Sequence, residues 1–161
     1  MARPRDFDPD AALDAAVRLF WERGFFATSV RDLCDAMGIQ PGSFYAAFGN
    51  KEACFRRALE RYLATQPQPG APGPDAIRAW LRVIVDPKRE PKGCLLVHSA
   101  VEHPSLDALT QSLVTERLEA LERFFTLCLR GRPSARADAS LLAATVLAIH
   151  VRARAGADSR E

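Results

Sequence analysis

The sequence predicts an all-α protein, and three observations lead to that prediction. Apolar residues recur at the three- and four-residue spacing of a helix through most of the chain, and N-cap residues, prolines and glycines bracket these stretches. The strict apolar–polar alternation that is typical of half-buried strands does not occur, and the chain has no internal repeat. With 161 residues, 48% of them hydrophobic, it can bury one large core or two modest ones.

The first predicted helix begins at Pro9. Asp8 is its expected N-cap, and a proline fits the first turn of a helix. Gly24 suits the position that ends the helix. Between them the apolar residues fall on one stripe, which consists of Leu13, Ala16, Val17, Phe20 and Trp21.

Two short helices joined by a tight glycine turn are predicted next. Thr28 or Ser29 caps the first of them, and Gly38 ends it. Its apolar face repeats at i, i+3, i+4 and i+7, in Val30, Leu33, Cys34 and Met37. Gln40 is the expected N-cap of the second helix, which is very short and covers about residues 41–47.

This second short helix has an apolar side and a polar side. Phe44 and Phe48 are expected to anchor it to the core, while Gln40, Ser43 and Tyr45 point elsewhere. A helix-turn-helix presents donors to a DNA groove and its phosphates in this way. A small helical hairpin of any other kind would also fit the spacing alone.

The later part of the chain follows a segment rich in proline and glycine, QPQPGAPGP, which has no helical potential and is a predicted linker. Behind it, further helices are predicted near residues 75–85, 93–102, 106–129 and 137–155. We therefore divide the chain into a candidate helix-turn-helix DNA-binding domain (1–49), a connecting helix (50–65), the linker (66–74) and a second helical domain (75–161).

The order of these features resembles the TetR family of bacterial transcriptional repressors, in its AcrR-like form. The resemblance rests on a basic N-terminal arm, an amphipathic helix, Thr-Ser-Val-Arg-Asp-Leu, Gly-Ile and Phe-Tyr-x-x-Phe-Gly-Asn-Lys-Glu, and it is strongest over residues 7–62. It implies that residues 75–161 form a regulatory ligand-binding and dimerisation domain, and that the protein is a homodimer that binds a double-stranded, palindromic DNA operator. In many members of the family a small hydrophobic inducer releases the repressor from that operator.

The residues predicted to contact DNA are Arg3, Arg5, Thr28, Gln40, Pro41, Gly42, Ser43, Tyr45 and Lys51. Arg3 and Arg5 lie on an arm that can reach a minor groove or can be a solvated tail. Gln40 can pair with adenine or with a phosphate. Lys51 stands in the first turn of its helix, where the macrodipole disfavours a cation, so a bound phosphate would remove a conflict. In the family, the residues matching Tyr45 and Lys51 usually touch the DNA backbone.

A ligand cavity is predicted between the helices of the regulatory half. Its candidate lining is apolar with a few polar groups: Phe55, Leu59, Tyr62, Trp80, Ile84, Cys94, His98, Val101, Leu121, Phe124 and Cys128. Aromatic stripes at helical spacing are also typical of ordinary core packing, which is the alternative interpretation.

Cys94 and His98 lie at i and i+4 and share a helix face. They can form a thiol–imidazole pair that senses electrophiles or oxidants, which would make the protein a thiol-based regulator. They can instead be half of a metal site with His103 or His150, or simply a buried cysteine and a hydrogen-bonded histidine.

The last predicted helix is apolar nearly all round and must be covered on more than one side. A second subunit would cover its outer face, with Leu142, Val146 and Ile149 as the predicted dimer interface. The alternative is a small domain whose core wraps the helix. Members of the family usually carry one more helix, and residues 157–161 resemble its first turn, so we expect the usual last helix to be lacking.

Other classes of protein are disfavoured by what the sequence does not contain. No run of 18 apolar residues or signal peptide is visible, so we expect a cytoplasmic protein without a membrane partner. The four cysteines are far apart, which argues against a disulfide framework or a zinc site. No phosphate-binding loop or catalytic motif occurs, so we expect neither enzymatic activity nor a cofactor. A helical protein-interaction adaptor remains as another alternative.

Overall fold

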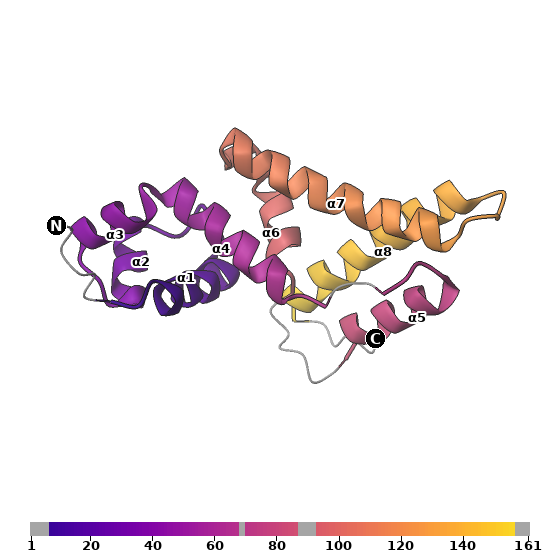
Figure 1. The fold of residues 1–161 in the computed structure, drawn as a ribbon, viewed down its shortest axis with the longest axis horizontal. Coiled ribbons are helices and arrows are strands. Elements are labelled where there is room, and N and C mark those ends of the chain that lie inside the picture. Colours follow the sequence, from indigo (N-terminus) through magenta and orange to yellow (C-terminus); the bar gives the residue numbers. More distant parts are fainter. Residues whose placement is uncertain (1–6, 68–69, 87–92, 157–161) are drawn as a thin grey trace.

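The computed structural model describes residues 7–67, 70–86 and 93–156, and the elements in these ranges are helices (Figure 1). No strand occurs in the described part of the chain, so the predicted all-α fold class is confirmed. The elements are α1 (Pro9–Arg23), α2 (Val30–Met37), α3 (Pro41–Phe48), α4 (Lys51–Thr65), α5 (Pro74–Ile84), α6 (Leu95–Val101), the 3-10 turn η1 (His103–Ser105), α7 (Ala108–Cys128) and α8 (Ala135–Arg154).

The molecule is elongated, with α1, α2 and α3 at one end and α5, α7 and α8 at the other (Figure 1). Helices α4 and α6 lie between the two groups and contact each other. Helix α4 packs along α1, and α7 packs along α8.

The helix starts follow the predicted cap chemistry. The side chain of Asp8 accepts the backbone N–H of Asp10, and that of Asn50 accepts the N–H of Ala53. Of the two candidates for the cap of α2, Ser29 is the one used. Its hydroxyl accepts the Asp32 N–H while the Asp32 carboxylate accepts the Ser29 N–H, which is a complete capping box.

Two clusters of buried side chains hold the helices together. The smaller one, which we call the second cluster, lies among α5, α7 and α8 and contains Ile77, Ile84, Phe125, Cys128, Leu129, Ala139 and Val146. The first is larger and centres on α1 to α4, with Phe20, Phe44, Phe55 and Leu59 among its fully buried members. Leu95, Leu106 and Val114 belong to this first cluster as well. The core beneath the predicted helix-turn-helix is therefore completed by residues from beyond the linker.

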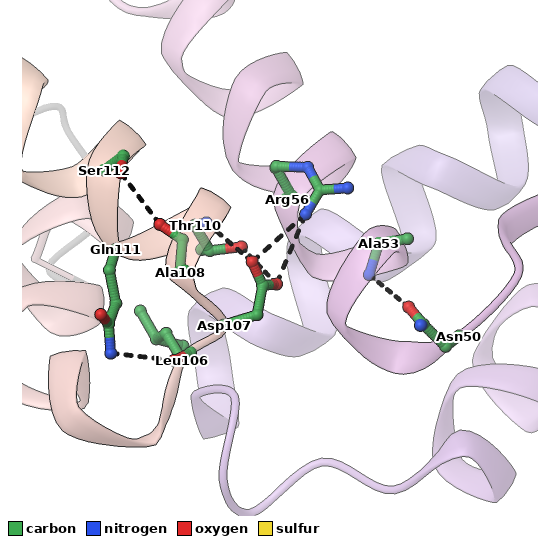
Figure 2. Close-up of polar contacts among 9 residues, drawn as sticks. All are labelled: Asn50, Ala53, Arg56, Leu106, Asp107, Ala108, Thr110, Gln111 and Ser112. Atoms are coloured by element: carbon green, nitrogen blue, oxygen red, sulfur yellow. Dashed lines mark hydrogen bonds and ion pairs between the residues drawn. The ribbon is translucent and has the colours of Figure 1, made fainter.

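A polar contact adds to this junction. Arg56 of α4 lies 3.3 Å from the carboxylate of Asp107, the N-cap of α7 (Figure 2). The same carboxylate accepts the backbone N–H and the hydroxyl of Thr110. Burial by itself raises the pKa of the Asp107 carboxyl, but the Thr110 hydrogen bonds and the Arg56 charge outweigh it and hold the pKa below its usual value.

Helix α8 turns the predicted dimer residues toward the protein's own core. Val146 is buried, and Leu142 and Ile149 are half-buried against the second cluster. The outward side of the helix instead carries Leu141, which is 68% exposed, and Val151, which is 52% exposed. Because the helix is apolar on both sides, its periodicity did not reveal which side faces inward.

No helix in the part of the chain that the structure describes is both long and apolar enough to span a bilayer. The predicted extra helical turn at residues 157–161 lies outside the described residues.

We expect Asp107→Ala to lower the free energy of unfolding by about 1–2 kcal/mol, because α7 loses its cap and Arg56 loses its partner. Urea denaturation followed by circular dichroism measures this. Ser112→Ala, an exposed change one turn further along α7, is the control and should be nearly neutral. Since the folded-state pKa of Asp107 is lowered, the stabilisation is present at neutral pH and is lost on acidification through that pKa. An undiminished difference in strong acid would contradict this account.

Candidate nucleic-acid interface and the cavity behind it

Helix α3 presents one side to solvent and is fixed by the other. Phe44 is 0% exposed and Phe48 is 4% exposed, so both aromatic rings lie in the first core as predicted. The neighbouring Tyr45 is 53% exposed, although its ring contacts the ring of Phe44 edge-on. Pro41 and Gly42 at the start of the helix are also exposed, and neither places a large side chain over the backbone.

The polar groups at the start of α3 are available to a partner. Gln40 is the N-cap as predicted, but its side chain makes no cap hydrogen bond, and it is exposed. Ser43 is half-buried one turn along. Gln40 and Tyr45 are thus exposed and Ser43 is partly exposed, and the N-cap side chain does not bind the first backbone N–H groups of the helix.

Thr28 does not belong to this patch. It is 1% exposed, and its hydroxyl donates to the carbonyl of Gly24 at 2.6 Å. The predicted phosphate contact is therefore corrected, because the hydroxyl closes the α1–α2 turn from inside and is shielded from solvent.

Lys51 also has a different position from the one expected. Its Nζ atom donates to the carbonyls of Phe25, at 3.1 Å, and Thr28, at 3.0 Å. The same atom lies 4.1 Å from the centroid of the Phe25 ring. The conflict with the helix dipole is thus relieved by carbonyl oxygens of the chain itself, so a bound phosphate is not needed to explain this lysine.

Arg31 is a cation that the sequence interpretation overlooked. It is exposed in the first turn of α2 and has no hydrogen-bond or ion-pair partner among the residues that the structure describes. The dipole argument that was applied to Lys51 applies here instead, since an unpaired cation at a helix start is unfavourable without an anion.

Several acidic groups of α1 and α2 are paired with arginines. Arg61 of α4 binds Asp14 through two hydrogen bonds and also Asp10, and this pairing lowers the pKa of the Asp14 carboxyl. Arg23 pairs with Asp32. Arg3 and Arg5, the predicted minor-groove arm, lie outside the described residues.

Behind this end of the molecule, α4 to α8 enclose a cavity of about 230 Å³. The predicted residues Trp80, Ile84, Cys94, Leu121 and Phe124 line it. Polar side chains at its wall come from residues that were not predicted, which are Gln66, Arg117 and His150.

Six of the predicted lining residues lie elsewhere. Five have their side chains engaged in packing: Phe55, Leu59 and Tyr62 in the first core, Cys128 in the second, and His98 against Gly24. Val101 is 73% exposed at the end of α6. Core packing, the alternative interpretation, explains the buried ones, because the aromatic residues of α4 face α1 and not the cavity.

The structure separates the proposed thiol–imidazole pair. Cys94 is the N-cap of α6 and lines the cavity, whereas the imidazole of His98 packs against the α1–α2 turn with its Nδ1 atom buried and unpartnered. Burial, reinforced by the Arg154 charge, lowers the pKa of His98. Across the described residues, no group of three or more His, Cys, Asp or Glu side chains is placed to hold a metal ion, which leaves the half-site with His103 or His150 without support.

Residues 12–58 match the family model described as bacterial regulatory proteins, tetR family. The chain is 52% identical over 61 residues to the HTH-type transcriptional repressor ComR of Escherichia coli (strain K12), covering 38% of this chain and 29% of ComR. It is 48% identical over 67 residues to the HTH-type transcriptional repressor BdcR of the same organism, covering 42% of this chain and 34% of BdcR.

A likeness to a solved structure extends over nearly the whole chain. A cysteine mutant of the TetR family transcriptional regulator CifR, complexed with 26bp double-strand operator DNA, superposes with a TM-score of 0.84 and 30% identity, over 98% of this chain and 93% of that chain. The alignments to the curated relatives ComR and BdcR, by contrast, span only about a third of those proteins.

We expect Lys51→Met to lower the free energy of unfolding by about 1–3 kcal/mol, because the carbonyls of Phe25 and Thr28 lose a charged donor. Denaturant unfolding followed by tryptophan fluorescence measures the change. Arg130→Met, at an exposed position near the end of α7, is the matched control and should be nearly neutral. Equal stability of the two variants would show that Lys51 does not hold the turn.

Proposed function

Because the chain belongs to the TetR family of bacterial regulatory proteins, we propose that it is a DNA-binding transcriptional repressor that binds a palindromic operator as a homodimer. The observation that carries the proposal is the two-sided character of α3, whose aromatic residues are buried while its polar ones face solvent. The CifR structure, which shares this fold, holds operator DNA. A palindrome suits a two-fold dimer with half-sites about one helical turn apart.

In this proposal the start of α3 enters the major groove. Gln40 reads a base edge or a phosphate through its free amide, and Ser43 and Tyr45 donate hydroxyl groups to the DNA. Arg31 binds a phosphate beside the groove. Lys51 and Thr28 act indirectly, by holding the turn that places α2 and α3.

The cavity supplies a site for a small hydrophobic inducer. Its walls are mostly apolar, and the polar side chains of Arg117, His150 and Gln66 lie at the wall, where they could orient a ligand. A molecule that fits the cavity only when the helices around it have shifted would favour a dimer whose two α3 helices are wrongly spaced for DNA. The predicted division into a DNA-binding and a regulatory domain belongs to this proposal.

A thiol-based signal at Cys94 is a second candidate for the regulation. Cys94 is the one half-exposed cysteine of the four, and it lines the cavity. Burial raises the pKa of Cys54 to about 12 and also raises the pKa of Cys34, so neither thiol is reactive at neutral pH. The sensor would be Cys94 by itself, without the imidazole partner that was first predicted.

A repressor of this kind acts on chromosomal DNA in the cytoplasm and has no catalytic step. The homodimer would use the outward side of α8, with Leu141 and Val151 in place of the predicted Leu142, Val146 and Ile149. Ala144 and Ala148 lie between these two exposed residues and let a second helix approach closely.

For DNA binding, we expect Gln40→Ala combined with Tyr45→Phe to weaken binding to the DNA upstream of the protein's own gene by about tenfold to a hundredfold. Arg31→Gln should weaken binding to every sequence and reduce the slope of log affinity against log salt concentration by about 1. Fluorescence anisotropy at several salt concentrations measures both effects. The matched control is Arg130→Gln, near the end of α7 and away from α3. Unchanged affinity in the Gln40 and Tyr45 variant would refute the docking of α3.

For the dimer, we expect Leu141→Asp to raise the dissociation constant of the homodimer at least tenfold, because a buried carboxylate lacks a partner across the interface. Sedimentation velocity measures the constant. Leu109→Asp is the control, since Leu109 is 65% exposed at the start of α7 and should leave the association unchanged. A dimer that tolerates Leu141→Asp does not use this side of α8.

A further inference from the structure

The turn between α1 and α2 is held by a carboxylate from outside the helix-turn-helix. The two oxygen atoms of Glu102, which follows α6, accept the backbone N–H groups of Phe25 at 2.8 Å and Phe26 at 2.9 Å. These residues lie 77 and 76 positions earlier in the chain. A single side chain thus satisfies two successive donors that no helix satisfies.

A cation from α8 binds the end of α1 immediately before this turn. The guanidinium of Arg154 donates to the carbonyls of Trp21, at 2.8 Å, and Glu22, at 2.9 Å. These carbonyls belong to the last turn of α1, where helical partners run out. The charges match the groups they bind, because the anion accepts N–H groups and the cation donates to carbonyl groups.

The contact leaves little room for adjustment. Gly24 has φ +86°, and a Cβ atom built there would lie 2.7 Å from Cε1 of His98 and 2.8 Å from an oxygen of Glu102. His98 and Glu102 therefore approach the turn backbone closely, and a side chain at Gly24 would have to displace the ends of these two side chains.

The two helices that supply these charges also form walls of the cavity. Helix α6 contributes Leu96 and Val97, with its N-cap Cys94, and α8 contributes Val146, Leu147 and His150. Glu102 directly follows α6, and Arg154 lies one turn beyond His150 in α8. A cavity wall and a turn contact therefore belong to the same short rigid segment in both helices.

We propose that Glu102 and Arg154 are positioning residues that transmit occupancy of the cavity to the α1–α2 turn, and through it to the orientation of α2 and α3. The inference rests on the proposed function and adds to it a route of regulation that does not pass along α4. A ligand that displaces α6 or α8 loosens the turn, and the two reading helices lose their fixed direction.

Alkylation of Cys94 by N-ethylmaleimide serves as the probe, because it places a group of known size at the cavity wall. Hydrogen exchange of the Phe25 and Phe26 amides, measured by NMR on the full chain, is the main readout. We expect alkylation to speed this exchange at least tenfold. Cys94→Ser treated with the same reagent should show no change, since the other thiols are buried.

Glu102→Gln tests the positioning role, because a carboxamide offers a single acceptor oxygen and turns its NH₂ group toward a donor. Exchange at Phe25 and Phe26 should be fast in this variant before alkylation and change less than twofold after it. Glu60→Gln, an exposed change on α4, is the matched control and should behave like the unsubstituted chain. Arg154→Gln provides a second variant with the same expected loss of response, and circular dichroism verifies that each variant is folded.

Two results would overturn the inference. One is an exchange rate of the Phe25 and Phe26 amides that does not change on alkylation of Cys94. The other is a Glu102→Gln variant whose exchange rate changes on alkylation as much as that of Glu60→Gln. Operator binding is measured by anisotropy on the same samples. If alkylation speeds exchange at the turn but the samples bind no DNA, the coupling between the cavity and the turn is supported and the proposed function is refuted. The two failures are therefore distinguishable. In samples that do bind, alkylation should weaken operator binding at least tenfold in the unsubstituted chain and less than threefold in Glu102→Gln.

Discussion

An eight-residue helix is not stable alone in water, so the exposed residues of α3 keep their positions only because the helix is anchored to the core. The rings of Phe44 and Phe48 supply that anchor, since both are buried in the first core. Their burial allows Gln40 and Tyr45 to remain exposed without loss of structure. Different side chains of the same two helical turns thus anchor α3 and face solvent.

The polar groups around the α1–α2 turn complete the arrangement. Carbonyl and N–H groups there have few helical partners, and the charged side chains of Lys51, Glu102 and Arg154 bind them instead. Backbone groups that are shielded from water and lack a hydrogen-bond partner destabilise the fold, so these contacts stabilise the turn. They connect the reading end of the molecule to α6 and α8, which reach the cavity.

Local features of the fold could be predicted from the sequence, and long-range ones could not. Capping residues and glycines act within four positions of each other, so the bounds of α1 to α4 were predictable to within a residue or two. Lys51 was misinterpreted because its partners lie 23 and 26 positions earlier, in a turn whose return toward α4 no local pattern reveals. The side of α8 that faces the protein's own core was not predicted for another reason: periodicity indicates an inward face only when the other face is polar.

Leu95, Leu106 and Val114 come from beyond the linker and yet fill the core beneath α1 to α4. The front part of the chain, if expressed alone, would leave apolar surface uncovered where these three side chains normally sit. Chimeric regulators that join this reading end to a foreign sensing half must therefore reproduce the three contacts as well as the length of the join. The packing unit that holds α1 to α4 therefore does not end where the proline-rich segment begins.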